Sequence, residues 1–285
     1  MTKVLVTGAT GFIGTHLITR LVAEAYEVFA PNSQSGDIAS NSTWSAFPSA
    51  EIVIHLAAKT FVPDSWVDPT LFLETNLNGT VCALNYCRER RARLIFISSY
   101  LYGVPEKLPI PESANLHANN PYALSKKMAE EVCRFYSDYY GVGVTILRPF
   151  NIYGPGQSTK FLIPSVVEQV MADTELRVKD LEPRRDYLFI DDLIEAFLRV
   201  IQRPQRFEIF NIASGTSHSV GEVINLIQKI AQKQLPVHSD GERRQQEVMD
   251  TRADISRARE ILDWYPRWSL NAGCARIIQD KNSLI

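Results

Sequence analysis

Tyr122 and Lys126 stand four positions apart in the segment NPYALSK, directly after Pro121. Residues at i and i+4 share one face of a helix, and proline is well tolerated at a helix start. A phenol has a pKa of about 10, so proton exchange near neutrality requires that pKa to fall by about 3 units, or roughly 4 kcal/mol. A nearby lysine ammonium favours the tyrosinate. The pair is therefore a candidate acid/base centre, although the same spacing also arises by chance in helices.

Two serines precede this pair. Ser98 and Ser99 end the strand-like run RLIFISS. A hydroxyl at a strand end is often a simple turn residue. Here it can also hydrogen-bond the oxygen atom that Tyr122 protonates, and its position at the end of a strand favours that functional role.

The segment TGATGFIG places Gly8, Gly11 and Gly14 between a strand-like run and an amphipathic helix. Glycines at this junction permit a tight turn, a close approach of backbone N–H groups to a pyrophosphate, and close packing of helix on strand. The pattern predicts a dinucleotide-binding loop. It lacks the GK[ST] sequence of a triphosphate-hydrolysing loop.

The residues after the second strand-like run determine how a ribose is held. An acid is expected there in an NAD-binding protein. This chain has Asn32 at that point and Asp37 five positions later, and no arginine or lysine lies between Arg20 and Lys59 to bind a 2′-phosphate. The sequence therefore predicts NAD or NADP as the cofactor without choosing between them.

Short β-rich runs alternate with longer helical runs over the first half of the chain. The strand-like runs are 3–7, 26–30, 51–58, 93–99 and 142–150, and the helical runs are 11–25, 69–91 and 121–140. This alternation predicts an α/β fold with a Rossmann-type doubly wound parallel sheet, whose ligands lie at the carboxyl ends of the strands.

After residue 156 the regular alternation of strand-like and helical runs ends, which predicts a smaller C-terminal lobe. We expect a cofactor-binding domain over 1–158, extended by about 188–212, and a second lobe over 159–187 and 213–285.

The overall composition is that of a globular protein. The hydrophobic content is 45% and the formal net charge is −2, so we expect neither nucleic acid nor a membrane as a partner. The N-terminus shows no secretion signal, and we expect a cytoplasmic location. The four cysteines have no CxxC spacing, so the sequence predicts reduced thiols and no metal site.

These motifs together resemble the extended short-chain dehydrogenase/reductase family, in its nucleotide-sugar epimerase/dehydratase branch. The resemblance covers nearly the whole chain. The segments that carry it are TGATGFIG, IHLAA (54–58), NLNGT, SSYLYG (98–103), NPYALSK, RPFNIYGPGQ (148–157), RRDYLFIDDL (184–193), FNIASG (210–215) and DISRAREILDWYP (254–266).

The resemblance implies roles for individual residues. Ser98, Tyr122 and Lys126 would form a catalytic triad, in which the lysine also binds the nicotinamide ribose. The remaining cofactor contacts would be Gly8, Gly11, Phe12, Ile13, Gly14, Asp37, Ile38, Leu56, Ala57, Ala58 and Asn76. The contacts to a nucleotide-diphosphate sugar, with the second lobe binding this substrate, would be Ser98, Ser99, Asn151, Arg185 and Arg244.

Several reactions fit this resemblance. A 4,6-dehydratase would carry a Thr-Asp-Glu series where this chain has Ser98, Ser99 and Tyr100, so that activity is disfavoured. Reduction of a 4-keto-6-deoxyhexose is favoured over 4-epimerisation, because only 18 residues separate Asn32 from Glu51 and because Ser-Ser-Tyr resembles the Thr-Asp-Tyr of known reductases. A non-catalytic, cofactor-sensing protein is the remaining alternative, and the intact triad argues against it.

The family resemblance also implies a homodimer. The helical runs 69–91 and 121–140 would pair across a two-fold axis, with Leu71, Leu77, Val81 and Leu84 at the contact. The same residues could equally face the sheet.

Overall fold

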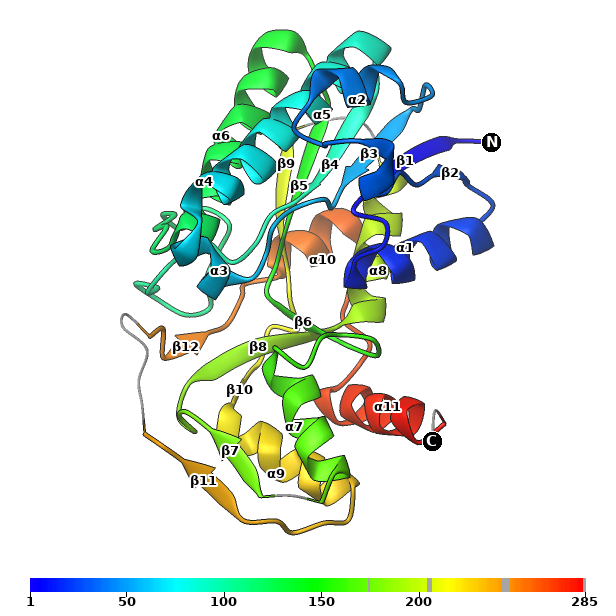
Figure 1. Ribbon diagram of the computed structural model, residues 1–285. Coiled ribbons are helices and arrows are strands. Elements are labelled where there is room, and N and C mark those ends of the chain that lie inside the picture. Colours follow the sequence, from blue (N-terminus) through cyan, green and yellow to red (C-terminus); the bar gives the residue numbers. More distant parts are fainter. Residues whose placement is uncertain (174, 204–206, 242–246, 284–285) are drawn as a thin grey trace. The chain divides into compact units, whose positions relative to one another are not determined.

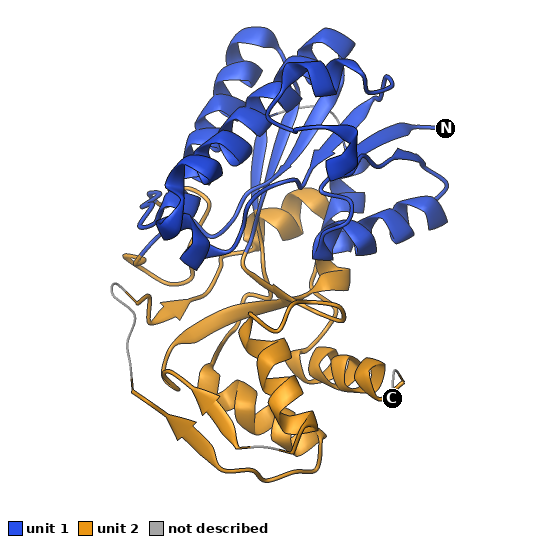
Figure 2. Cartoon of the chain, viewed as in Figure 1, with its two compact units in different colours: residues 1–103, 115–149, 194–210 blue, residues 104–114, 150–193, 211–285 orange. Residues whose placement is uncertain are grey.

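The computed structural model describes residues 1–173, 175–203, 207–241 and 247–283. The chain forms two compact units (Figure 2). Unit 1 contains Met1–Gly103, Asn115–Pro149 and Ile194–Phe210, and unit 2 contains Val104–Ala114, Phe150–Leu193 and Asn211–Ile285. The segment Val104–Ala114 thus belongs to unit 2, whereas the sequence placed it in the first domain. Binding of the cofactor by one unit and of the substrate by the other stays a prediction.

A six-stranded sheet forms the centre of unit 1, in the order β2-β1-β3-β4-β5-β9. Its strands are β1 (Lys3–Thr7), β2 (Glu27–Phe29), β3 (Ile52–His55), β4 (Arg93–Ile97), β5 (Val144–Pro149) and β9 (Glu208–Ile212). The pairs from β2 through to β5 are parallel. Because the winding reverses between β1 and β3, a crevice is expected at the carboxyl ends of these two strands.

Helices cover both faces of this sheet, as the ribbon in Figure 1 shows. The long helices are α1 (Phe12–Ala23), α5 (Gly79–Arg90), α6 (Pro121–Tyr140) and α8 (Ile190–Ile201). The short elements of unit 1 are the 3-10 turn η1 (Ser33–Ser35), α2 (Asn41–Ser45), α3 (Val62–Val67), α4 (Pro69–Phe72) and the π-helical turn η2 (Leu73–Asn78). All five residues of β4 are buried, as expected for a parallel strand that is covered on both faces.

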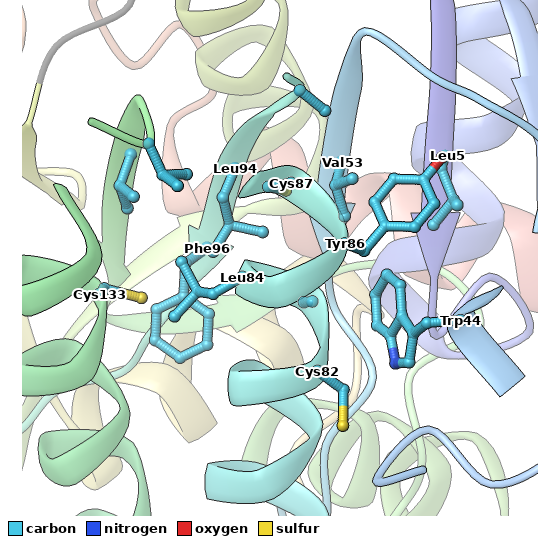
Figure 3. Packing of buried hydrophobic residues seen from close by; sticks show 14 of the residues in the cluster. Leu5, Trp44, Val53, Cys82, Leu84, Tyr86, Cys87, Leu94, Phe96 and Cys133 are labelled. Carbon is cyan, nitrogen blue, oxygen red and sulfur yellow. The ribbon is translucent and has the colours of Figure 1, made fainter. Parts of the chain in front are cut away.

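A hydrophobic core lies between the central sheet and α5–α6. Alternate residues of the strands, among them Leu5, Val53 and Phe96, point to this side. They pack against α5 and α6, including Leu84 and Cys133 (Figure 3). All four cysteines are buried and none is in a disulfide.

Unit 2 is built on a smaller sheet, in which β8 pairs with β10, β12 and β6. These strands are β6 (Asn151–Tyr153), β8 (Arg184–Phe189), β10 (Ser217–Ser219) and β12 (Asp250–Thr251). A separate pair is β7 (Leu176–Val178) with β11 (Val237–Ser239), and the helices are α7 (Leu162–Met171), α9 (Val220–Ile230), α10 (Ser256–Leu262) and α11 (Leu270–Asn282).

The α/β fold with a parallel, doubly wound sheet is confirmed. One element differs from expectation. The helical run 69–91 is not one α-helix, because the wide turn η2 separates α4 from α5.

Two further findings concern the described residues. None of their helices is both long and apolar enough to cross a membrane. In the same part of the chain, no group of three or more His, Cys, Asp or Glu side chains is placed to hold a metal ion.

Candidate active site

The start of α6 fixes the positions of Tyr122 and Lys126. Asn120 has extended backbone, and its side chain accepts a 2.8 Å hydrogen bond from the N–H of Ala123. Pro121 then occupies the first helical position, where a missing N–H costs nothing. Tyr122 therefore lies in the first turn, half-buried, and Lys126 follows one turn later with only 2% of its surface exposed.

Lys126 lies against the sheet. Its Nζ is 4.1 Å from the ring centroid of Phe96, the fourth residue of β4. Burial lowers the pKa of Lys126 to about 7, while Cys133 and Glu130 act in the opposite direction. The ammonium is thus poised to lose its proton near neutral pH, and it faces the ring rather than water.

The two serines after β4 have different surroundings. Ser98 is 4% exposed, and its Oγ has no hydrogen-bond partner among the described residues. Ser99 is half-buried. Burial raises the pKa of the Tyr122 phenol, and hydrogen bonding by the Ser99 side chain opposes that rise. The role expected for Ser98, a hydrogen bond to the oxygen atom that Tyr122 protonates, stays a prediction. The Ser98 hydroxyl is left for a ligand.

The glycine-rich loop has no room for side chains. Gly8 has a φ of +69°, and a Cβ there would lie 2.6 Å from the backbone N of Ala57. A Cβ on Gly14 would lie 2.3 Å from the carbonyl oxygen of Gly8. A side chain at Gly8 or Gly14 would collide with backbone atoms, so these glycines let α1 and the loop after β3 lie close to the end of β1.

The first turn of α1 suits an anion. Its N-cap is Gly11, and no side chain caps the N–H groups of that turn, which includes Phe12 and Ile13. Uncapped amides at a helix N-terminus bind phosphate well. With no room for a Cβ at Gly8 and Gly14 and no side-chain cap on α1, this loop fits a pyrophosphate-containing cofactor.

Asn76 is a structural link between the loop after β3 and α6. It lies in the π-helical turn η2 and is fully buried. Its Oδ1 accepts a 2.8 Å bond from the Lys59 N–H, and its Nδ2 donates to the Lys59 carbonyl and to Ser125 Oγ. The amide thus orders the segment that contains Leu56, Ala57 and Ala58. The cofactor-lining role expected for Asn76 from the sequence stays a prediction.

His55 is the last residue of β3 and directly precedes this segment. Sequence reasoning missed it. Its Nδ1 is 2.8 Å from Thr7 Oγ1, and its Nε2 is buried without a partner among the described residues. Burial and the charge of Lys126 lower the pKa of His55 to about 3, so the imidazole is neutral.

The residues after β2 form a polar turn without an acid in it. Asn32 caps the 3-10 turn η1 by accepting a 2.9 Å bond from the Gln34 N–H. Asp37 is exposed and accepts a 2.9 Å bond from the Ala39 N–H. Ile38 is half-buried, and its carbonyl accepts from Trp44 Nε1. No carboxylate therefore lies directly at the end of β2.

Two predicted substrate residues lie in unit 2. Asn151 donates a 3.3 Å bond to the Asp186 carbonyl. Arg185 donates to the carbonyls of Arg184 and Val248 and forms an ion pair with Glu247, which sequence reasoning missed. Arg244 lies outside the described residues. The Arg185 guanidinium is therefore already bound to one carboxylate.

The parallel sheet, the glycine-rich loop and the serine–tyrosine–lysine cluster define a Rossmann-type enzyme that binds a nicotinamide dinucleotide. Residues 4–213 match the model of the NAD dependent epimerase/dehydratase family. The chain belongs to this family, which confirms the resemblance drawn from its motifs.

Three relatives show what this family contains. The GDP-6-deoxy-D-mannose reductase of Pseudomonas aeruginosa is 32% identical, covering 99% of this chain and 98% of that protein. A structure of RMD from Pseudomonas aeruginosa complexed with NADPH has a TM-score of 0.93 at 31% identity, with 100% of both chains covered. The UDP-glucuronic acid 4-epimerase of Bacillus cereus, in complex with UDP-glucuronic acid and NAD, has a TM-score of 0.91 at 25% identity, also with 100% of both chains covered.

The protein is accordingly an enzyme that uses NAD or NADP. Its structural neighbours bind nucleotide sugars.

Proposed function

We propose that this enzyme reduces the 4-keto group of a GDP-linked 4-keto-6-deoxyhexose. The observation that carries this proposal is the full-length similarity, at 32% identity, to a GDP-6-deoxy-D-mannose reductase. The serine pair agrees with it, because Ser98 and Ser99 provide hydroxyls and no acid at the position where a dehydratase would need one.

In this proposal each group of the triad acts on the C4 oxygen or on the group that protonates it. The cofactor supplies hydride to C4 when it is bound. Tyr122 donates its phenolic proton to the C4 oxygen, and the buried Ser98 hydroxyl hydrogen-bonds the same oxygen. Lys126 binds the nicotinamide ribose and, as an ammonium, favours the tyrosinate that remains. Gly8, Gly11 and Gly14 let the backbone approach the pyrophosphate.

We also propose that NADPH is used in preference to NADH. The turn after β2 has Asn32 in place of the acid that would bind the ribose diol and repel a 2′-phosphate. Because no lysine or arginine lies between Arg20 and Lys59, we expect this preference to be modest.

In unit 2, we propose that Arg185 binds the diphosphate of the sugar nucleotide and that Asn151 contacts the substrate. Guanidinium and phosphate match in geometry and charge. Binding requires Arg185 to exchange the carboxylate of Glu247 for a phosphate.

The second candidate function is 4-epimerisation of a nucleotide sugar. The observation that favours it is the full coverage of both chains in the match to a UDP-glucuronic acid 4-epimerase. An epimerase retains its NAD through turnover, whereas a reductase must exchange its cofactor in every cycle.

A single preparation distinguishes the two functions. The purified protein is denatured, and the released nicotinamide is assayed. We expect substoichiometric cofactor, together with rapid oxidation of added NADPH in the presence of GDP-4-keto-6-deoxymannose. Stoichiometric bound NAD and no NADPH oxidation with this substrate would contradict the reductase and support the epimerase.

We further propose a homodimer formed through α6. Four apolar side chains on this helix are 37% to 74% exposed and recur at helical spacing: Leu124, Met128, Phe135 and Tyr139. Exposed apolar stripes of this kind are typical of interaction surfaces. Leu71 of α4 is 38% exposed as well, whereas Leu84 of α5, which the sequence placed at this contact, is buried in the core.

A further inference from the structure

A buried ion pair lies one helical turn beyond Lys126. Glu130 of α6 receives hydrogen bonds from Arg148 of β5, with Nε 3.0 and 3.2 Å from its two carboxylate oxygens and Nη2 2.6 Å from one of them. The two side chains are only 5% and 4% exposed. A buried pair is tolerated only when the geometry is good, and this forked arrangement satisfies both carboxylate oxygens.

The same guanidinium reaches the segment that carries the serines. Arg148 Nη1 donates a 2.9 Å bond to the hydroxyl oxygen of Tyr102. Tyr102 lies three residues beyond Ser99, and its ring packs edge-on against that of Tyr100. Arg148 therefore joins the segment after β4 to α6, the two elements that carry Ser99 and Tyr122.

The position of Glu130 gives this pair a chemical consequence. A glutamate four residues from a lysine on one helix ordinarily attracts the ammonium. Here Arg148 occupies the carboxylate, and Lys126 Nζ lies over the Phe96 ring instead. The titratable groups that raise the pKa of Lys126 are Cys133 and Glu130 of α6, and the charge of Lys126 in turn lowers the pKa of His55.

We propose that Arg148 is a positioning residue for the active site: by binding the Glu130 carboxylate, it prevents an ion pair between Glu130 and Lys126 and leaves the Lys126 ammonium available to the cofactor ribose and to Tyr122. This inference rests on the cofactor-binding role proposed for Lys126. It does not depend on whether the enzyme is a reductase or an epimerase.

The experiment compares Arg148→Gln, Glu130→Gln and the double variant. The dissociation constant of NADPH is measured by nicotinamide fluorescence from pH 6 to about pH 11, which spans both the ordinary and the lowered lysine pKa. Thermal unfolding is followed in parallel. Because the ammonium binds the ribose, affinity in the wild type falls as pH rises through the pKa of Lys126.

In Arg148→Gln, the released carboxylate pairs with Lys126. We expect NADPH affinity to fall by about tenfold and the pH at which affinity is lost to rise by about one unit. Glu130→Gln removes a negative charge that stabilises the Lys126 ammonium. NADPH affinity should therefore be lost at a lower pH than in the wild type. The double variant has no carboxylate to compete for Lys126. Its NADPH affinity should match that of Glu130→Gln to within about threefold, which is less than about one kcal/mol of binding free energy.

Arg93→Gln is the matched control. Arg93 is also buried in unit 1, and it donates to the backbone carbonyls of Val200, Ile201 and Arg203, at and just beyond the end of α8. Its loss should lower the melting temperature without moving the pH dependence of NADPH binding.

An Arg148→Gln protein that changes only in stability, as Arg93→Gln does, would overturn the proposal. If Arg148→Gln does not fold, the test uses the double variant instead. A folded double variant that binds NADPH about tenfold more weakly than Glu130→Gln would also overturn the proposal. The readout is cofactor binding, so a negative result in the reductase assay of the wild type leaves this test intact.

Discussion

Tyr122 is the residue whose hydroxyl the chemistry requires. We expect Tyr122→Phe to lower kcat by roughly 10²- to 10⁴-fold, the usual contribution of a positioned acid. NADPH affinity should change little, because Lys126 and the glycine-rich loop remain. The measurement is steady-state NADPH oxidation with the keto sugar, alongside fluorescence titration of the cofactor.

Tyr136→Phe is the control for this prediction. Tyr136 lies on the same helix, and its hydroxyl donates to Asn85 Oδ1 at 2.8 Å, a contact on α5 rather than with the serines. It should keep normal turnover. Unchanged turnover in Tyr122→Phe would exclude the proposed mechanism.

The two serines should have separable effects on the pH profile. The bond from Ser99 lowers the pKa of the Tyr122 phenol against the effect of burial. Reduction requires the protonated phenol, so kcat/KM falls as pH rises through this pKa. Ser99→Ala should therefore move the alkaline limb of the profile to higher pH.

Ser98→Ala should lower kcat and leave that limb in place, because Ser98 makes no bond to the phenol. Ser99→Thr keeps a hydroxyl and should restore the wild-type profile. If Ser98→Ala moved the limb and Ser99→Ala did not, the roles of the two serines would have to be exchanged.

At the scale of the element, the junction of β1 and α1 depends on the absence of side chains. The Cβ of Gly14→Ala would lie 2.3 Å from the Gly8 carbonyl oxygen and 2.7 Å from that of Ala9. Backbone atoms cannot yield as a flexible side chain does, so α1 must move away from the strand. We expect a loss of about 1–3 kcal/mol in stability and at least tenfold weaker NADPH binding.

Gly221→Ala provides the comparison. Gly221 also lies in the first turn of a helix, α9, and its nearest contact for a Cβ is at 3.7 Å. Urea unfolding should show little loss of stability for this variant, because alanine has a higher helix propensity than glycine. Equal stability of the two variants would mean that the β1–α1 junction relaxes without cost.

The turn η2 is a second feature of element scale that matters to the site. A π-helical turn shifts the residues after it around the helix axis. Here it lies at Asn76, whose side-chain amide hydrogen-bonds Lys59 and Ser125 at once. The irregular turn thus joins the loop after β3 to α6, the helix that carries Tyr122 and Lys126.

At the scale of the whole molecule, the exposed stripe on α6 predicts self-association. Phe135 is 49% and Tyr139 74% exposed, and their rings lie 4.7 Å apart. We expect a dimer by sedimentation at micromolar concentration. The double variant Phe135→Glu/Tyr139→Glu should be monomeric, because it places two charges in an apolar contact.

Val22→Glu is the control for the dimer. Val22 is a 60% exposed residue of α1. This variant should remain dimeric. A wild-type protein that sediments as a monomer would refute the proposed interface.

The sequence alone determined the fold class, the family and the short-range motifs. Gly8 and Gly14 follow from backbone sterics, and Tyr122 and Lys126 follow from helical spacing after an Asn-Pro cap. Such features depend on a few consecutive residues, so their spacing reveals them.

Only the tertiary structure determined which side chains pair with one another. Glu130 pairs with Arg148, 18 residues away, rather than with its helical neighbour Lys126. Arg185 pairs with Glu247 across 62 residues. The reason is physical: a charged or polar group binds whichever partner is buried with it, and packing between distant segments determines that partner.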